Sequence, residues 1–251
     1  ENCIRCCDLV IDRKIKEYED AYAKNPTTID IDLYGKYPLI SESGANQNYA
    51  GNTYQRIFGE GNSFESIFEL NFMKTQKETN SAVSSYYGSS SNSNGQLAVA
   101  SPAAESPYTG TNSIFAKTDC RFLENIHSGT SISYVQKYVA ELMSFRTSTT
   151  TGAAPSVKAD ARTTDHANWI VYRLTDVMLM RAEAEVEMAG NVELGSTLTD
   201  EQMEHYQRAF SCVSAVWKRA NNKRTATADP LVFDDYATSR AVMEDLVMDE
   251  R

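Results

Sequence analysis

The sequence lacks any apolar run long enough to cross a membrane. Its apolar stretches fall well short of the roughly 20 consecutive apolar residues that a transmembrane helix needs. A basic stretch followed by an apolar one, which would mark a secretory signal, does not precede Glu1. We therefore expect no membrane-spanning helix, and we expect that the mature chain begins at Glu1 or that a preceding segment was removed.

Positive charge is scarce relative to negative charge. The 24 lysines and arginines are outnumbered by 34 aspartates and glutamates, which gives a net charge of -10 and a pI of about 4.9. Proteins that bind nucleic acid neutralise its phosphates with clustered lysine and arginine, so nucleic acid is not an expected partner. A neutral sugar is little affected by this charge, and the acidity leaves glycan binding open.

Cysteine occurs in a pattern that does not predict a metal site. The chain has 5 cysteines, so at least one thiol is free or pairs outside the chain. A structural zinc site usually shows two ligand pairs at a characteristic spacing. Here one Cys-x-x-Cys-Cys group is present, formed by Cys3, Cys6 and Cys7, and no second ligand pair follows it. The remaining cysteines, Cys120 and Cys212, are isolated in the sequence. We expect the N-terminal cysteines to be buried on a helix, with no metal and no cofactor.

A catalytic constellation is also missing. Catalysis requires converging groups, such as two carboxylates at a fixed distance or a nucleophile beside its base. Asp165 and His166 are adjacent in sequence, and neighbours of this kind rarely face one reacting atom, so His166 is interpreted as a loop residue. His205 lies near Glu201 and Glu204 on a predicted helix, where a solvated face explains it better than a metal. The chain is not expected to be an enzyme.

What the sequence does contain is helical periodicity near its N-terminus and two short alternating segments. Apolar residues at intervals of three and four predict an amphipathic helix from Ile4 to Tyr22. A second, short helix is predicted from Tyr49 to Phe58, closed by Gly59. Alternation predicts strands at Ser66–Phe72, with Phe68, Leu70 and Phe72 on one half-buried face, and at Ser131–Tyr138.

Two long polar segments are predicted to be loops. Thr79 to Gly95 is rich in Ser, Asn and Gly, a composition that buries too little apolar area to offset the entropy of ordering it. This predicted loop continues to about Pro107. Thr147 to Asp165 is predicted to be a second polar loop.

The C-terminal third carries the clearest helical pattern. A helix is predicted from Val171 to Ala189, ending at Gly190, and its Glu183, Glu185 and Glu187 are expected to make solvent or packing contacts. Thr199 and Gln202 match a capping box that starts a second helix. Its apolar stripe is regular and predicts antiparallel packing on the first helix; it comprises Met203, Tyr206, Phe210, Val213, Trp217 and Ala220. A further helix is predicted from about Ser239, and the pattern still continues at Arg251.

The segment NWIVYRLTDVMLMRAEA, from Asn168 to Ala184, resembles the most recognisable stretch of the SusD/RagB family. That stretch has an arginine, an aromatic residue or leucine, a small residue, an acidic residue, an aliphatic run and Ala-Glu-Ala. Other pieces follow in the family's order: Ser66–Glu69, Asp119 with Arg121, Lys137–Tyr138, Ala209–Ala220 and the closing Asp245–Arg251.

The resemblance implies a mostly α fold, a tetratricopeptide-like helical scaffold with long loops and a few short strands. Residues 1–251 would form a single SusD-like domain that lacks the family's N- and C-terminal ends. It also implies a place on the cell surface at the outer membrane. Cys3 follows Glu1-Asn2 rather than the apolar and small residues of a lipid-attachment site, so the implied lipid anchor lies outside this chain.

Three tyrosines in the long predicted loop are candidate ligand contacts. Sugar binding needs aromatic rings against the apolar face of a pyranose, with polar groups around it for the hydroxyls. Long loops on a rigid scaffold are where such sites usually lie. The candidate binding residues are Tyr86, Tyr87 and Tyr108, with Asn80, Asn92 and Asn94 as possible hydrogen-bonding neighbours. Trp169 and Trp217 lie on predicted helical stripes and are interpreted as core residues.

The leading hypothesis is a nutrient-binding protein that captures a glycan or oligosaccharide and delivers it to a SusC-like TonB-dependent transporter. A peptide-binding relative fits the same scaffold. A helical-repeat scaffold that binds only protein partners is the alternative from another class, with binding carried by the helices around Val171 to Ala220. A glycoside hydrolase would need two carboxylates across a cleft, and the sequence selects no such pair.

Overall fold

The structure of the chain is a computed structural model. It describes residues 1–21, 31–41, 52–73, 75, 78–87, 96–97, 119–128, 133–135, 137–138, 140–146, 156–161, 166–221 and 230–251.

The chain divides into two compact units, each built from segments that are far apart in sequence. The helical unit comprises Glu1–Leu39, Tyr172–Arg219 and Asp229–Arg251. The mixed unit comprises Ile40–Val171 and Ala220–Ala228.

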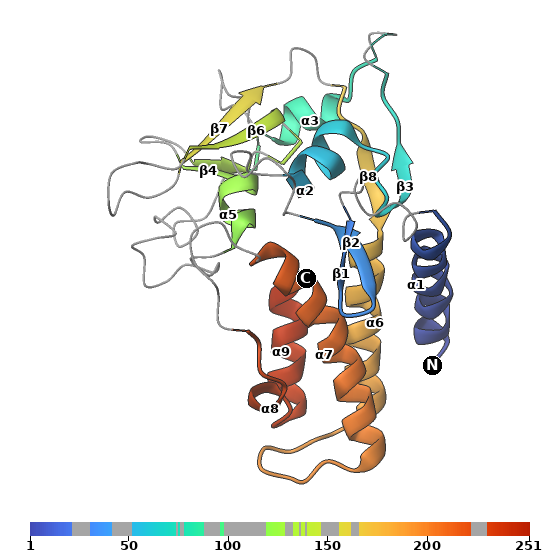
Figure 1. The fold of residues 1–251 in the computed structure, drawn as a ribbon. Helices are drawn as coiled ribbons and strands as arrows, with labels where there is room; N and C mark the ends of the chain where they lie inside the picture. The colour runs from blue at the N-terminus through green and yellow to red at the C-terminus, as the bar shows by residue number, and fades with distance from the viewer. Residues whose placement is uncertain are drawn as a thin grey trace. The chain divides into compact units, whose positions relative to one another are not determined.

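Long helices dominate the helical unit where the structure describes it (Figure 1). They are α1 (Asn2–Ala21), α6 (Leu174–Ala189), α7 (Asp200–Ala220) and α9 (Arg240–Glu250). A short helix, α8 (Phe233–Tyr236), precedes α9, and a two-stranded sheet pairs β1 (Ile31–Tyr34) with β2 (Tyr37–Ile40). The predicted fold class, mostly helical with a few short strands, is confirmed. None of the described helices is both long and apolar enough to span a membrane.

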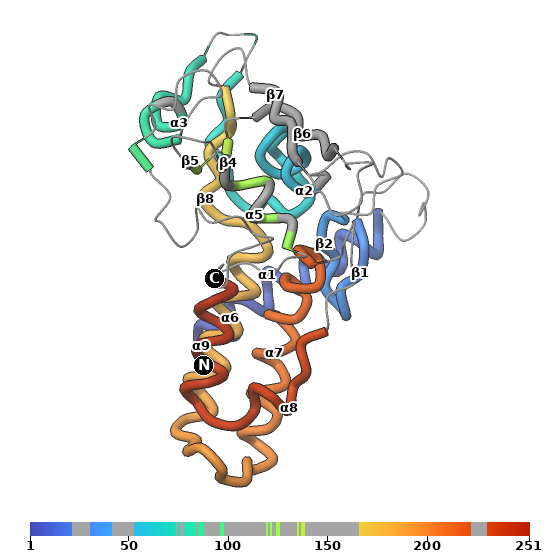
Figure 2. The backbone as a smooth tube through the Cα atoms, turned by 90° about the vertical axis from the view of Figure 1, so that its left-hand side faces the viewer, coloured from blue at the N-terminus to red at the C-terminus, as the bar shows by residue number. Residues whose placement is uncertain are grey.

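The long helices pack around one hydrophobic core. Both views show α6, α7 and α9 side by side, with α7 antiparallel to α6 as predicted (Figures 1 and 2). Helix α1 packs against α6. The buried positions recur every three or four residues, and each Leu or Met among them stabilises the fold by roughly 1.5–3 kcal/mol. The fully buried residues include Leu174, Met178 and Ala182 of α6, Tyr206, Ala209 and Val213 of α7, and Met243 of α9.

The ends of these helices follow the predicted capping signals. Helix α6 ends at Gly190, whose φ of +71° is disfavoured for residues with a side chain. At the start of α7, Thr199 N–H donates to Gln202 Oε1 at 3.0 Å, and Gln202 N–H donates to Thr199 Oγ1 at 3.2 Å. Ser239 caps α9 by accepting from the Val242 N–H at 3.3 Å. The predicted helix at Ile4–Tyr22 is likewise confirmed through Ala21 as α1. The expected burial of its cysteines holds only for Cys7, because Cys3 and Cys6 lie on the exposed side of the helix.

The predicted start of α6 at Val171 is wrong. Residues Trp169–Arg173 form strand β8, and the helix begins at Leu174. The run of aromatic and β-branched residues before Arg173 favours a strand. Asp176 then fixes the boundary, because its carboxylate accepts from the Arg173 N–H at 3.2 Å and lies 3.8 Å from the Arg173 Nε.

The described part of the mixed unit contains short helices and three two-stranded sheets. Strand β3 (Ser66–Leu70) pairs with β8, β4 (Ile126–Ser128) pairs antiparallel with β5 (Ser133–Val135), and β6 (Ala140–Arg146) pairs antiparallel with β7 (Ser156–Ala161). The helical pieces are α2 (Asn52–Tyr54), the π-helix η1 (Gln55–Glu60), α3 (Ser81–Tyr86) and α5 (Cys120–Asn125).

Three predictions for this unit need correction. The segment Thr79–Gly95 is not wholly a loop, because Ser81–Tyr86 forms α3 and Val83 is buried at 2% exposure. The segment Thr147–Asp165 contains β7, which pairs from Arg146↔Ser156 to Ala140↔Ala161. The short helix is not closed by Gly59, since the π-helix runs on to Glu60 and ends at Gly61. In the first two cases the polar composition of the segment led to the prediction of a loop, although part of the segment is ordered by contacts with other parts of the chain.

The strand predicted at Ser66–Phe72 forms as β3, but its apolar face is not buried as predicted. Phe68 is 52% exposed and Leu70 is 48% exposed. The inward position between them is taken by Glu69, whose Oε2 accepts from the Asn62 N–H at 2.8 Å and from the Asn168 Nδ2 at 3.1 Å. Hydrogen bonds to a carboxylate, rather than apolar burial, therefore orient this strand.

Hydrogen bonds of Asn168, which form a polar clasp, join the start of β8 to β3 and to the residues just after it. Besides binding Glu69, Asn168 accepts from the Phe72 N–H at 3.1 Å through Oδ1. Gly61 lies against the same side chain with φ +72°. A Cβ at position 61 would overlap the Asn168 amide nitrogen and lie 3.0 Å from its Cγ. Glycine is therefore required here for both backbone conformation and space.

We predict that Gly61→Ala lowers the free energy of unfolding by about 2–4 kcal/mol, because it adds an overlap to a left-handed backbone. Gly35→Ala is the matched control: Gly35 has φ +66° but nothing within 4 Å of a Cβ, so the loss should be about 1 kcal/mol. Urea unfolding followed by circular dichroism measures both. Equal losses would contradict the role assigned to Asn168.

Candidate functional site

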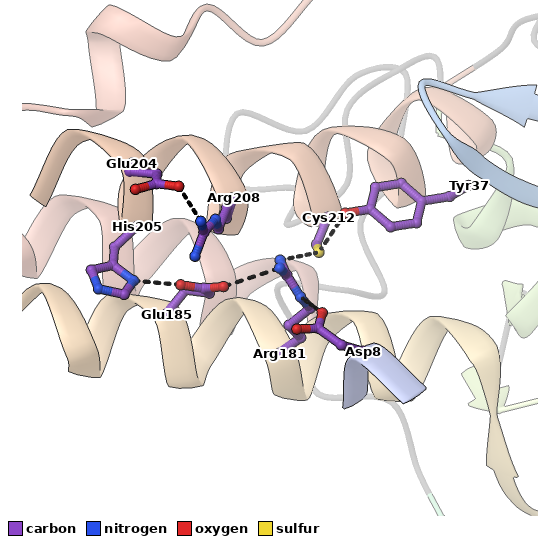
Figure 3. Close-up of polar contacts among 8 residues, drawn as sticks. All are labelled: Asp8, Tyr37, Arg181, Glu185, Glu204, His205, Arg208 and Cys212. Atoms are coloured by element: carbon purple, nitrogen blue, oxygen red, sulfur yellow. Dashed lines mark hydrogen bonds and ion pairs between the residues drawn. The ribbon is translucent and has the colours of Figure 1, made fainter. Parts of the chain in front are cut away.

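Two groups of side chains stand out as candidate sites, and the first is a buried polar network in the helical unit (Figure 3). Its centre is Arg181 on α6, whose side chain is 7% exposed. Arg181 Nε donates to Asp8 Oδ1 of α1 at 2.6 Å, and Nη2 lies 3.1 Å from Oε1 of Glu185, an ionic contact without hydrogen-bond geometry. The guanidinium thus joins two helices.

The network extends from Glu185 to α7 and from Arg181 to β2. Glu185 is fully buried, and its Oε2 lies 2.5 Å from Nδ1 of His205. On the other side, Arg181 Nη1 contacts Cys212 Sγ at 3.9 Å, and Cys212 Sγ contacts the Tyr37 hydroxyl at 3.2 Å. The expectation that His205 lies on a solvated face is therefore wrong, because its side chain is only 13% exposed and packs toward α6.

Burial controls the protonation of this network. It raises the pKa of the Cys212 thiol, although the hydrogen bond from Tyr37 and the charge of Arg181 act in the opposite direction. Burial also raises the pKa of the Tyr37 hydroxyl, and the neighbouring Cys212 raises it further. The pKa of Arg181 would be lowered by burial alone, but Asp8 and the other surrounding groups raise it above its ordinary value.

These directions indicate a structural network rather than a reactive centre. A nucleophilic cysteine needs a lowered pKa and access to substrate, whereas Cys212 is buried with a raised one. Within the described part of the chain, no three His, Cys, Asp or Glu side chains gather as metal ligands would. Arg181 is surrounded by partners on α1, α6 and α7, so its charge holds these helices together.

We predict that Glu185→Ala destabilises the helical unit by about 3–5 kcal/mol, because it leaves the buried Arg181 short of negative charge. Glu183→Ala is the control on the same helix. Glu183 is 44% exposed and pairs with Arg251 at the surface, so its loss should cost less than about 1 kcal/mol. Chemical unfolding of both variants gives the comparison, and a small effect at Glu185 would show that the network does not stabilise the fold.

Alkaline pH should destabilise the folded chain through its buried thiols. Burial, with smaller contributions from Cys3 and Asp8, raises the pKa of Cys7 from 9.0 to about 12, and burial raises that of Cys212. The folded state therefore holds these protons more tightly than the unfolded state. The stabilisation is fully present below pH 9.0 and is lost as pH rises toward the folded pKa.

We expect the free energy of unfolding to fall above pH 9.0 by up to about 1.4 kcal/mol per pH unit for each thiol. Urea titrations at pH 7 to 11 measure this slope. The double variant Cys7→Ala/Cys212→Ala should show a shallower fall, relative to its own value at pH 7. Parallel curves for the two proteins would refute the assignment.

The second group is an aromatic cluster in the mixed unit, made of Tyr54, Phe58, Tyr87, Tyr138 and Trp169. Tyr138 and Trp169 stack with ring planes 13° apart and centroids 5.6 Å apart. Phe58 meets Tyr138 edge-on, with centroids 5.2 Å apart, and its ring is tilted by 52° against that of Tyr54 at 5.4 Å. The interpretation of Trp169 as a core residue on a helical stripe is therefore wrong, because it lies on strand β8 and is only partly buried, stacked on Tyr138.

The structure separates the candidate tyrosines. Tyr86, the last residue of α3, is 45% exposed. Tyr87 follows it and turns into the aromatic cluster, 5.3 Å from Tyr138 and 6.5 Å from Trp169; burial raises its pKa. Tyr108 lies outside the described residues. Of the two candidate tyrosines that the structure describes, Tyr86 is exposed to solvent and Tyr87 is packed in the aromatic cluster.

The asparagines divide in the same way. Asn80 is 4% exposed, and its Nδ2 donates to the Ala167 carbonyl at 3.0 Å. The suggestion that the Asn80 side-chain amide donates to a sugar is therefore wrong, because this N–H group is used within the protein. It anchors the start of α3 to Ala167. Asn92 and Asn94 lie outside the described residues. The aromatic cluster could not be predicted from periodicity in the sequence, because its five residues come from separate short elements and turns.

Comparison with protein families matches residues 36–251 to the SusD family. Searches of curated proteins and of solved structures found no match. The match covers most of the chain, from β2 through the long helices to the C-terminus, and it agrees with the mostly helical fold. The chain belongs to the SusD family. Members of this family are non-enzymatic, surface glycan-binding proteins of nutrient acquisition.

Proposed function

We propose that this chain binds a glycan or oligosaccharide at the cell surface and delivers it to a SusC-like TonB-dependent outer-membrane transporter. A lipid anchor outside this chain holds it at the outer membrane. Membership of the SusD family supports the class of ligand and the nutrient-uptake role.

The observation that carries the ligand site is the exposed Tyr86 ring at the end of α3. A pyranose has an apolar face that aromatic rings cover well, while its hydroxyls need polar partners. Tyr86 is 45% exposed and is joined directly to Tyr87, which is packed in the aromatic cluster. A ring on a fixed support loses little conformational freedom when ligand binds, which favours affinity.

Tyr87 and Tyr108 complete the proposed site in different ways. Tyr87 is half-buried, so it contributes the support for Tyr86 and an edge of its own ring. Tyr108 remains a proposed contact on the basis of its residue type and its place in the sequence. The segment 96–97 lies against this end of α3, since the Gln96 N–H donates to the Ser85 carbonyl and the Leu97 N–H to the Tyr86 carbonyl, both at 3.0 Å.

We predict that the purified chain is retarded in affinity gels containing at least one of starch, xylan, β-glucan or galactomannan. Tyr86→Ala should weaken that binding about tenfold, because it removes a stacking ring. Tyr87→Ala and Tyr108→Ala should also weaken it. A glycan array run in parallel extends the panel.

Tyr172→Ala is the matched control. Tyr172 is 51% exposed and lies at the end of β8 that belongs to the helical unit, since the boundary between the units falls after Val171. Its loss should leave binding unchanged. Equal losses in Tyr86→Ala and Tyr172→Ala would move the site away from α3. Absence of binding by the unmodified chain on gels and array alike would instead favour a peptide ligand or a scaffold that binds only proteins.

A further inference from the structure

The backbone of Tyr138 has an unusual conformation. Among the described residues other than glycine, only Asn62 and Tyr138 have positive φ, at 49° and 72°. Asparagine tolerates this region, but a bulky aromatic residue rarely adopts it, since its Cβ crowds the backbone. Tyr138 lies in the turn between β5 and β6 and is 4% exposed. Surrounding contacts must therefore stabilise a conformation that the residue alone disfavours.

Those contacts are rings on three sides of Tyr138. Trp169 stacks on it at 5.6 Å, while Phe58 and Tyr87 meet it edge-on at 5.2 and 5.3 Å. The neighbouring Lys137 adds a cation over the Phe58 ring, 4.8 Å from its centroid. Edge-on and stacked pairs of this kind are favourable beyond the area that they bury. The left-handed turn thus directs the Tyr138 ring into the aromatic cluster.

One of these rings belongs to Tyr87, the C-cap residue that directly follows α3. The Tyr87 N–H donates to the Val83 carbonyl at 3.0 Å and closes the helix. Its ring contacts Tyr138 and, less closely, Trp169. Because α3 has only 6 residues, its own hydrogen bonds cannot keep it folded in isolation. The position of Tyr86 therefore depends on how Tyr87 is held.

We propose that Tyr138 is a positioning residue for the ligand site: its ring holds Tyr87, and thereby fixes the end of α3 and the direction of Tyr86. The role in ligand binding rests on the proposed function. The mechanical part, that the ring fixes α3, stands on the contacts alone. The sequence spacing between positions 87 and 138 gives no sign of this dependence.

Amide hydrogen exchange tests the mechanical part without any ligand. Tyr138→Leu keeps an apolar side chain but removes the ring contacts, so the amides of Val83 and Tyr87 should exchange at least about tenfold faster. Tyr138→Phe keeps the ring and should restore slow exchange. Tyr206→Leu, which removes an equally buried tyrosine from α7, should leave the α3 amides unchanged. Unchanged α3 exchange in Tyr138→Leu would overturn the proposal.

Tyr87→Leu serves as a second variant if circular dichroism shows that Tyr138→Leu does not fold. It removes the same ring pair from the other side and should accelerate exchange at Val83. Unchanged exchange there would overturn the proposal.

Retardation on the starch, xylan, β-glucan and galactomannan gels then tests the link to ligand. Tyr138→Leu should weaken binding about tenfold in the unmodified background but have little further effect in Tyr86→Ala. Additive losses would reject action through Tyr86. If no gel retards the unmodified chain, the glycan proposal fails while hydrogen exchange still decides the role of Tyr138.

Discussion

The buried positive charge of Arg181 is the interaction on which the helical unit depends. A guanidinium that is 7% exposed is costly unless anions and hydrogen-bond acceptors surround it. Asp8 from α1 and Glu185 from α6 meet that requirement, and Glu185 in turn engages His205 of α7. Apolar packing supplies most of the stability, but this network specifies which helix faces meet. The His, Cys, Glu and Arg side chains of this network therefore serve to hold the helices together, and nothing in their geometry indicates a catalytic role.

The mixed unit uses aromatic packing where the helical unit uses charge. Its elements are short, and few of them could be stable alone. The aromatic cluster draws together η1, the residue after α3, the turn before β6, and β8. The clasp of Asn168 with Glu69 adds a polar anchor at the start of β8. For the glycan site proposed at Tyr86, such a support would keep the exposed ring in place before ligand arrives.

Sequence reasoning succeeded where structure is local and failed where partners come from elsewhere. The α7 stripe, the Thr199–Gln202 box and the Gly190 terminus depend on residues within a few positions, so their outcomes followed from spacing. His205 was placed in solvent because Glu185 lies on another helix. Composition alone could not reveal α3, since its order depends on Val83 and Tyr87 reaching a core assembled from distant segments.

For the candidate site, the sequence proposed Tyr86 and Tyr87 as ligand contacts, but it could not predict that one ring is exposed and the other packed. Both are tyrosines beside each other in a polar segment, and only the position of Tyr138 separates the exposed ring from the packed one. The family resemblance recognised from Asn168–Ala184 was confirmed over residues 36–251. This resemblance gave the class of protein correctly, because much of the segment forms α6, whose residues build the core and the Arg181 network. Ligand contacts depend on surface residues that such a motif does not contain.

The most direct test of the account is nuclear magnetic resonance of the chain with its 14 tyrosine rings isotopically labelled, titrated with soluble oligosaccharides from starch, xylan, β-glucan and galactomannan. Glycan binding at α3 predicts saturable chemical-shift changes in the ring resonances of Tyr86, smaller changes in those of Tyr87, and none at the buried Tyr206 of the helical unit. Saturable shifts confined to tyrosines of the helical unit, or none with any of these sugars, would contradict the claim that Tyr86 marks a glycan site.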